Sequence, residues 1–498
     1  MTDRRHGLSK SRLISHLQCP KRLWLQVFKP EVAEAGDGAR RRMASGIQAG
    51  EVARDMFPGG HLVDEPDIAA ALYTTRALLD AEIRIPIYEA ALDCDGVLVF
   101  TDILVPEDGG WHLVEVKSSS TVKDYQKPDA TVQTWVARQA GVNITRTSIA
   151  CIHNKFVYPG GGDYRGLFYL TDISAVVNGR LAEVGEWVRD SRATLAGSEP
   201  DIQVGDQCFT PFDCPFHEYC RPPEAKRPEH PLSDLPNARK LVAALLEQGY
   251  EDLREVPVEL LTNGIHQRIQ QAAISGEAFV SDTVQGVLAA WAYPRYYLDF
   301  ETIQFTVPIW AGTSPFQQIP FQWSCHIESA LGVLEHREFL AQGAGDPRRE
   351  FAETLADLLA DLVNNNGTII AYNAGFERSR ISELARQFPE FALVLTAATS
   401  HVVDLLPVAR QHFYHPDMHG SWSIKYVLPA IAPELSYKGM VVADGMMAQL
   451  AFAELIADLT PDQQAQTRQA LLDYCAQDTY AMVKIAHFFA GDGIDKTD

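Results

Sequence analysis

Two carboxylates and a lysine stand on consecutive predicted strands in the first quarter of the chain. Asp102 lies near the end of one strand, and Glu115-Val116-Lys117 lies on the next. Because side chains alternate along a strand, Glu115 and Lys117 share a face and can converge with Asp102. Carboxylates are the hard oxygen ligands that Mg²⁺ takes, and a nearby lysine can stabilise charge on a phosphate. Taken alone the pattern also fits a surface ion pair.

A second acidic set follows in the last two hundred residues. LDFET places Asp299 and Glu301 two residues apart on a strand, so both face one side. LLDYCAQDTYAMVKI puts Tyr474 and Asp478 four residues apart on one helical face. Three further residues lie between these two segments. Asn373 and Glu377 stand at the strand-to-helix junction in IIAYNAGFERSRI, and Asp404 follows in VVDLLPVAR.

Soft metal ligands are concentrated in CFTPFDCPFHEYC, which contains Cys208, Cys214 and Cys220. Thiolates suit zinc or an iron–sulfur cluster. The five-residue gaps are wider than the C-x₂₋₄-C of most zinc fingers, which favours a cluster. Unliganded core thiols are the remaining alternative, and a fourth ligand must come from elsewhere in the chain.

The elements that must position these residues form two α/β patterns around a helical connector. We expect domains at 1–222 and 290–490, separated by a proline-rich linker at 223–236 and a helical connector at 237–282. In the first domain, predicted helices at 11–28, 38–57 and 67–82 precede the strands, and a helix at 129–141 follows them. From Tyr296 onward strands and helices alternate again.

The order of elements in the first domain resembles the RecB-like branch of the PD-(D/E)XK nucleases. That resemblance implies a PD-(D/E)XK fold in which Asp102 and Glu115 hold Mg²⁺ or Mn²⁺ beside Lys117. It further implies that Gln133 positions the lysine or the substrate. Glu51, in GIQAGEVARDMFP, would be a further acid from the preceding helix, or equally a solvated helix residue.

The segment LSKSRLISHLQCPKRLWL is similar to the opening of the iron–sulfur members of that RecB-like group. The resemblance implies that Cys19 joins Cys208, Cys214 and Cys220 to hold a 4Fe-4S cluster. The first gap of the trio has five residues where two are common in those relatives. A Cys₄ zinc site therefore stays open as an alternative.

The second acidic set resembles the tyrosine subtype of the DEDD exonucleases, which have an RNase H-like fold. The resemblance implies that Asp299, Glu301 and Asp478 hold two metal ions and that Tyr474 orients the attacking water. Glu377 would be a further metal ligand, at a position where the family usually has aspartate. Asp404 would be structural or face the substrate, and Ser423 and Lys425 would reach a phosphate or lie in a solvated loop.

Composition limits the functional class. The 498 residues are 46% hydrophobic and 22% charged, which is typical of a globular protein. The net charge of −22 argues against a general electrostatic grip on nucleic acid, though not against a local one. No apolar run reaches ~18 residues, and the N-terminus lacks the apolar region of a secretory signal, so we expect a cytoplasmic protein without a membrane partner.

These observations lead to one functional hypothesis and one alternative. The hypothesis is a metal-dependent nuclease that acts on nucleic acid, with DNA preferred over RNA, and whose C-terminal half trims strands from 3′ to 5′. The alternative is a nucleic-acid-binding or assembly protein in which one or both sites have lost catalysis.

Overall fold

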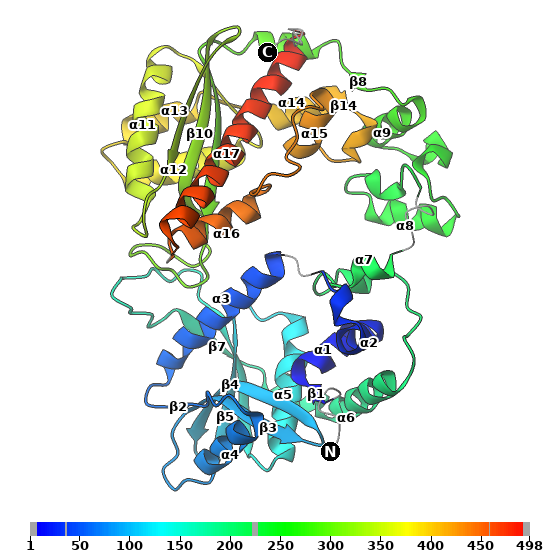
Figure 1. Ribbon diagram of the computed structural model, residues 1–498, viewed down its shortest axis with the longest axis vertical. Coiled ribbons are helices and arrows are strands. Elements are labelled where there is room, and N and C mark those ends of the chain that lie inside the picture. Colours follow the sequence, from blue (N-terminus) through cyan, green and yellow to red (C-terminus); the bar gives the residue numbers. More distant parts are fainter. Residues whose placement is uncertain (1–6, 35–36, 222–227, 458, 492–498) are drawn as a thin grey trace. The chain divides into compact units, whose positions relative to one another are not determined.

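The computed structural model describes residues 7–34, 37–221, 228–457 and 459–491, and Figure 1 shows its helices and strands. The chain is a mixed α/β protein, as the sequence predicts. It divides into two compact units. The first contains Met1–Pro222 and Phe305–Gln317, and the second contains Pro223–Gln304 and Gln318–Asp498. None of the helices described has the length and apolar character that crossing a membrane requires.

The first unit is built on one sheet with the strand order β2-β3-β4-β5-β6-β7, and β1 pairs with β4. Strands β3, β4 and β5 are antiparallel, whereas β5 and β6 are parallel and are joined through α5 (Lys127–Gln139). Asp95 and Gly96 both have positive φ (49° and 68°), which suits the two-residue turn between β3 and β4. The strands are β1 (Leu8–Ser9), β2 (His61–Leu62), β3 (Ile87–Cys94), β4 (Val97–Glu107), β5 (Gly110–Lys117), β6 (Ile144–Ile152) and β7 (Phe168–Asp172).

Helices cover both faces of this sheet. Buried residues of α1 (Lys10–Gln18), α4 (Ile68–Leu79), α5 and α6 (Ser174–Ala196) form one core with the strands. Ala49 and Ala53 of α3 (Asp37–Ala53) belong to the core on the other face. The remaining helices of the unit are α2 (Pro20–Phe28) and α7 (His217–Cys220).

A segment from late in the sequence completes the first unit. Between β9 and β10 the chain contributes residues 305–317, and Val307 is fully buried in the core that contains α3. The backbone of Tyr158 pairs with this segment on both sides, since its N–H donates to Thr313 and its carbonyl accepts from Gly312. The folded first unit therefore needs residues that lie far beyond residue 222.

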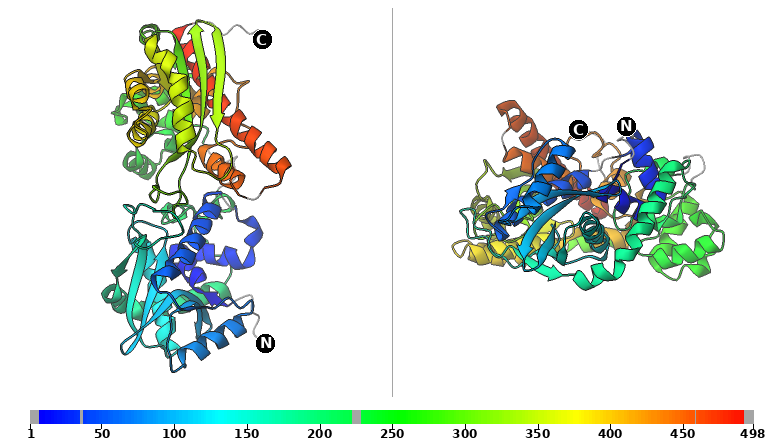
Figure 2. Two further views of the ribbon diagram at one scale, coloured as in Figure 1. Left: turned by 90° about the vertical axis from the view of Figure 1, so that its left-hand side faces the viewer. Right: turned by 90° about the horizontal axis from the view of Figure 1, so that it is seen from below.

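The second unit contains a five-stranded sheet with the order β11-β10-β9-β12-β13. Strands β9, β10 and β11 are antiparallel, and β12 and β13 run parallel to β9. Helices α11, α12 and α13 cover one face and the long α17 crosses the other (Figure 2). The elements are β9 (Arg295–Ile303), β10 (Ile319–Ala330), β11 (Val333–Leu340), β12 (Thr368–Ala371), β13 (Val402–Asp404), α11 (Arg348–Asn364), α12 (Gly375–Gln387), α13 (Ala392–Thr399) and α17 (Pro461–Ala490).

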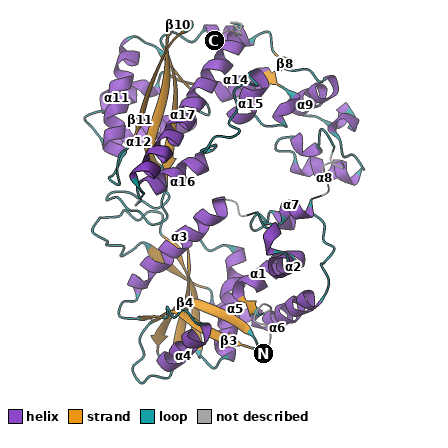
Figure 3. Cartoon of the chain, viewed as in Figure 1, coloured by secondary structure: helices purple, strands orange, loops and turns teal. Residues whose placement is uncertain are grey.

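The helical connector packs as part of the second unit (Figure 3). Leu253 and Leu261 of the connector lie in the same core as Tyr297 of β9 and Met482 of α17. Leu232 and Leu235, at the end of the expected proline-rich linker, are buried in this core too. The elements are α8 (Arg239–Glu247), α9 (Gly264–Ser275), β8 (Phe279–Val280) and α10 (Val284–Ala289); β8 pairs with β14 (Phe413–Tyr414).

Candidate metal centres

Three carboxylates meet at the centre of the second unit. Asp299, Glu301 and Asp478 each offer an oxygen, and these oxygens all lie within 4.8 Å of one another. Among the described residues, no other group of three or more His, Cys, Asp or Glu side chains brings its ligand atoms that close. A divalent cation prefers such a set of hard oxygen ligands.

The alternation of β9 explains how the triad forms. Tyr296, Leu298 and Phe300 belong to the core on the α11 side of the sheet. Their neighbours along the strand therefore face α17. Asp299 and Glu301 thus project toward the helix that supplies Asp478, and Tyr474 lies one turn before Asp478 on that helix.

Charge repulsion in this triad is strong. Burial, followed by the charges of Asp478 and Glu301, raises the pKa of Asp299 well above its usual range. Burial and the charge of Asp478 raise the pKa of Glu301 to about 8. Burial also raises the pKa of Asp478, although the hydroxyls of Tyr437 and Tyr474 oppose this by hydrogen bonding. The three groups need a proton or a cation to share the site.

Two tyrosines and one lysine surround Asp478. The Tyr437 hydroxyl donates to Asp478 Oδ1, and the Tyr474 hydroxyl also bonds this carboxylate. The Lys425 ammonium lies 5.3 Å from the Tyr474 ring centroid and 5.6 Å from that of Tyr437, and it donates to the Ala443 carbonyl. Tyr437 escaped the sequence analysis because it lies outside any periodic element. Lys425 is held beside the triad rather than in a solvated loop.

Glu377 and Asp404 lie near the triad but outside it. Glu377 is 2% exposed, its Oε2 has no hydrogen-bond partner, and burial raises its pKa to about 8. Asp404 Oδ1 accepts from the backbone N–H groups of Asn373 and Leu406, each at 3.0 Å. It thereby caps α14 (Leu405–His412) and fixes Asn373, whose φ is 73°. The structure does not bring Glu377 into the ligand set.

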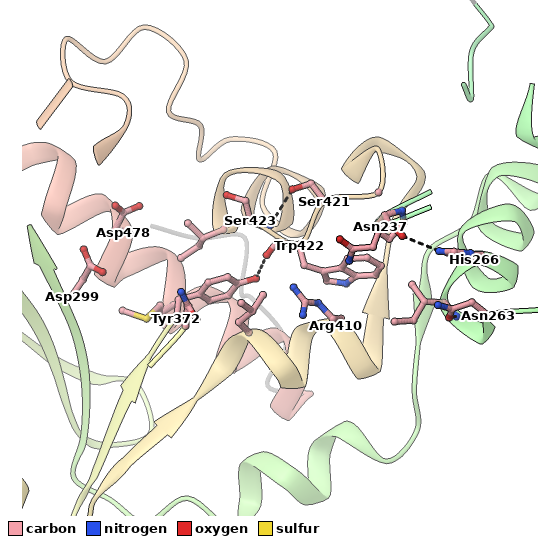
Figure 4. Close-up of a pocket in the computed structure, with 17 residues that line it drawn as sticks. Asn237, Asn263, His266, Asp299, Tyr372, Arg410, Ser421, Trp422, Ser423 and Asp478 are labelled. Atoms are coloured by element: carbon pink, nitrogen blue, oxygen red, sulfur yellow. Dashed lines mark hydrogen bonds between the residues drawn. The ribbon is translucent and has the colours of Figure 1, made fainter. Parts of the chain in front are cut away.

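A cavity of about 590 Å³ opens beside the triad within the second unit. Figure 4 shows Asp299 and Asp478 at one end and Asn263 and His266 at the other. Ser423 lines the cavity, as a phosphate-facing residue would. The size lies in the ~300–1,000 Å³ range of small-molecule sites.

The first unit holds a second acidic cluster, on strands β4 and β5. Asp102 Oδ2 accepts from the Val116 N–H at 2.6 Å. Glu115 is 1% exposed and both of its oxygens are bonded: Lys10 and Lys117 donate to Oε1, and Gln133 donates to Oε2. Asp102, Glu115 and Lys117 therefore lie together, as strand alternation predicts, and Gln133 joins them through a hydrogen bond to Glu115.

Lys10 and Asp129 belong to the same cluster, and the sequence analysis missed both. The Lys10 ammonium lies 3.3 Å from Glu115 Oε1 and 3.2 Å from Asp129 Oδ1. Lys117 also pairs with Asp129. Asp129 precedes Gln133 by four residues on α5, so helical spacing could have indicated it. Lys10 gives no local signal, since it lies 105 residues before Glu115.

The lysines compensate the charge of this cluster only in part. Burial, followed by the charges of Asp102 and Asp129, raises the pKa of Glu115 to about 7. Burial raises the pKa of Asp102 too, against the lowering effect of Lys10 and Lys117. For Asp129 the net direction is opposite: burial is again the largest single influence and opposes ionisation, yet the combined charges of the two lysines hold its pKa below the usual range.

Glu89, rather than Glu51, is the further acid next to this cluster. Glu89 lies on β3 between the register pairs Tyr88–Ile103 and Ala90–Thr101, with φ 55°, and burial raises its pKa. Its charge acts on Asp102. Glu51 is exposed on α3 and makes no hydrogen bond or ion pair with the residues that the structure describes. A non-glycine residue with positive φ beside an acidic cluster is typical of functional sites.

The four predicted cluster cysteines line one small cavity in the first unit: Cys19, Cys208, Cys214 and Cys220. Gln18 holds the two segments together, since its Nε2 donates to the carbonyls of Gln207 and Phe212 at 2.8 Å each. Burial raises the pKa of Cys214 and Cys220, while the charges of Arg22 and Lys21 oppose this.

Among the described residues, no three of these sulfurs form a close-set metal-ligand group. This geometry does not choose between a 4Fe-4S cluster and a Cys₄ zinc site.

Comparison with known proteins gives a partial match. The domain of unknown function DUF2779 matches residues 296–423. An uncharacterised protein of Mycoplasma pneumoniae is 28% identical over 259 residues, which is 49% of this chain and 39% of that protein. Uncharacterised proteins of Ureaplasma parvum and Mycoplasma genitalium are 26% and 24% identical, over 39% and 41% of this chain. The matched stretches span between 31% and 39% of these relatives' own length.

Proposed function

We propose that this protein is a metal-dependent nuclease whose second unit hydrolyses phosphodiester bonds from the 3′ end of a strand. The observation that carries the proposal is the triad of Asp299, Glu301 and Asp478, whose oxygens lie within 4.8 Å of one another. Glu301 and Asp478 are buried, Asp299 is half-buried, and all three have raised pKa values, so a nearby positive charge stabilises their ionised forms. Mg²⁺ or Mn²⁺ would supply that charge, and carboxylate oxygens are the ligands that both prefer.

The topology supports an RNase H-like unit of the DEDD type. Three antiparallel strands followed by two strands parallel to the first, in the order β11-β10-β9-β12-β13, are expected of that fold. The central strand β9 supplies Asp299 and Glu301, and the last helix supplies Tyr474 and Asp478. The convergence of Asp299, Glu301 and Asp478 supports their proposed role as metal ligands, and Glu377 stays outside that group.

The residues of the site divide the work as follows. Asp299, Glu301 and Asp478 would hold the divalent cation, which supplies a polarised phosphate and an activated water. Tyr474 would orient that water through the hydroxyl that bonds Asp478, and Tyr437 fixes Asp478 by donating to Oδ1. Lys425, held against both rings, lowers the cost of negative charge on the phosphate oxygens.

The cluster of the first unit supports a second nuclease site of the PD-(D/E)XK type. Strands β3, β4 and β5, helix α5 and strand β6 follow one another in the order expected for the core of that fold. Asp102 and Glu115 would hold a cation there, with Lys117 beside the phosphate and Gln133 orienting Glu115. Lys10 and Lys117 now occupy Glu115 Oε1, so a cation must displace at least one ammonium.

For the four cysteines we propose a 4Fe-4S cluster with a structural role. The donor set fits, because four thiols line one cavity beside Lys21 and Arg22, whose charges offset that of thiolates. The described cysteines form no disulfide, which agrees with a reducing compartment such as the cytoplasm. About four irons per chain after anaerobic purification are expected. Stoichiometric zinc without iron would identify the alternative Cys₄ zinc site.

Separate replacement of Asp102 and Asp299 by alanine tests the proposed function. Cleavage is measured with Mg²⁺ or Mn²⁺ on single- and double-stranded DNA and RNA, with DNA expected as the preferred substrate. We expect Asp299→Ala to abolish the release of mononucleotides from the 3′ end of the strand. Asp102→Ala should leave that release unchanged. If wild type binds strands but cleaves none under any of these conditions, the alternative of a nucleic-acid-binding or assembly protein holds.

A further inference from the structure

The cavity beside the triad has a far wall that is made by the helical connector. Asn237 precedes α8, and Asn263 is the N-cap of α9. Both line the cavity, together with Arg410 of α14. In Figure 4 Arg410 and Trp422 lie between the two acidic residues and the connector residues.

Packing fixes this wall in place. His266, 6% exposed, bonds the Pro236 carbonyl through Nε2 at 3.0 Å and thereby holds the turn before Asn237. Gly420 has φ 73°, and a Cβ there would lie 1.8 Å from the carbonyl oxygen of Asp234. The connector backbone and the segment after β14 therefore touch directly, as only glycine allows. The wall is preformed rather than assembled around a ligand.

Arg410, Asn237 and Asn263 are exposed where they line the cavity, so their donors are accessible to a ligand. The Arg410 guanidinium makes no hydrogen bond or ion pair with the residues that the structure describes, although the Arg410 carbonyl accepts from Arg268. Asn263 Oδ1 caps α9 by accepting from the Ile265 N–H at 2.9 Å, and its amide N–H₂ makes no bond with described residues. The side chain of Asn237 makes none either, and His266 Nδ1 is buried without a partner.

The chemistry of these groups indicates a nucleotide. A guanidinium binds phosphate through paired N–H donors. Asparagine amides bind the edges of bases, with two donors and one acceptor each. A volume of about 590 Å³ accepts the end of a single strand, whereas a duplex is far larger.

We propose that the connector turns this cavity into a subsite for the terminal nucleotide of a single strand. Arg410 binds its phosphate, and Asn237 and Asn263 bind its base. This inference rests on the proposed function of the triad. It adds Arg410, Asn237 and Asn263 as the residues that select the terminal nucleotide. Asn237 and Asn263 lie outside residues 296–423, so base selection would be a property that the connector adds to the matched domain.

Titration of the full chain with nucleoside 5′-monophosphates tests the inference. Binding of the four ribonucleotides, the four deoxyribonucleotides and ribose 5-phosphate is measured by calorimetry with Mg²⁺ present. We expect nucleotides to bind more tightly than ribose 5-phosphate. Arg410→Ala should weaken all of them about 10-fold or more, and Arg410→Lys should restore part of the loss.

The asparagine variants are chosen to keep the fold. Asn263→Asp retains the capping oxygen of α9 and removes the amide donor, and Asn237→Gly suits a φ of 55°. Each should change the ranking of the four bases by roughly 3–10-fold while leaving ribose 5-phosphate unaffected. Arg386→Ala, an exposed arginine on α12 outside the cavity, is the matched control.

Two results would overturn the subsite. One is equal binding by Arg410→Ala and Arg386→Ala, and the other is equal affinity for ribose 5-phosphate and every nucleotide. Cleavage by the same proteins separates this failure from failure of the proposed function. If wild type cleaves, Asp299→Ala does not and the connector variants bind nucleotides as wild type does, the subsite fails while the function stands. If wild type binds nucleotides through Arg410 but does not cleave, the subsite is supported and the proposed nuclease function fails.

Discussion

The two acidic clusters of this protein differ in how their charge is balanced. In the first unit two ammonium groups, from Lys10 and Lys117, contact Glu115 and Asp129 directly. In the second unit the triad of Asp299, Glu301 and Asp478 is contacted by neutral groups, two tyrosine hydroxyls and the Cys475 thiol, while the Lys425 ammonium is held by a carbonyl nearby. The second cluster therefore lacks positive charge that the first already has. We infer that the second unit binds a divalent cation more tightly.

The largest expected effect is loss of that tight site. Replacing Asp299 by asparagine removes a charged ligand and should weaken Mn²⁺ binding to the second unit by roughly 100-fold or more. Loss of a residue that only hydrogen-bonds a metal ligand already lowers metal affinity by ~10–100-fold. Calorimetric titration of Mn²⁺ into the metal-free protein measures this. The control is Asp473→Asn, because Asp473 is an exposed acid on α17, the helix that carries Asp478. Unchanged tight binding in Asp299→Asn would place the cation elsewhere.

A smaller effect separates the two tyrosines. Tyr474→Phe removes the hydroxyl proposed to orient the water, together with one of the two tyrosine bonds to Asp478, and its main effect should be an about 30-fold fall in kcat. Tyr437→Phe releases Asp478 and should raise the Mn²⁺ concentration for half-maximal rate about 10-fold. Steady-state rates at several Mn²⁺ concentrations measure both. Identical profiles for the two variants would contradict these separate roles.

Removing a lysine should make the first cluster more like the second. Lys10→Met deletes one of the two cations on Glu115, so Mn²⁺ affinity of the first unit should rise by roughly 10-fold, because a competing charge is gone. Lys155→Met, an exposed lysine in the same unit, is the control. The assay uses an Asp299→Asn background, in which only the first unit responds. A fall in Mn²⁺ affinity would show that Lys10 supports the site instead of competing for it.

Stability should depend on pH in the absence of metal and much less in its presence. The pKa of Glu301 is about 8 in the folded chain and 4.5 as a free group, so the folded chain binds more protons between these values. Without metal, the free energy of unfolding should therefore fall as pH rises from about 5 to 8. The melting temperature should fall with it by several degrees. Mg²⁺ should remove most of this slope, as seen by calorimetric melting with EDTA or Mg²⁺. A rise in stability with pH in EDTA would contradict the raised pKa.

The positions that follow a local period were predictable from the sequence, and those that depend on distant contacts were not. Asp299, Glu301, Tyr474 and Asp478 come together because strand and helix periods fix their directions. Tyr437 lies in a loop 41 residues before Asp478, with α16 (Gly445–Leu455) between them, and their contact has no signature in the sequence. The same holds for the 305–317 segment, which joins the first unit from within the second half of the chain.

The most direct test of the triad is release of the terminal nucleotide from a 3′-labelled single strand with Mg²⁺ present. Wild type and Asp102→Asn should both release the labelled mononucleotide, and Asp299→Asn should release none above background. Equal release by Asp299→Asn and wild type, or its loss in Asp102→Asn alone, would contradict the account of the second unit as the exonuclease.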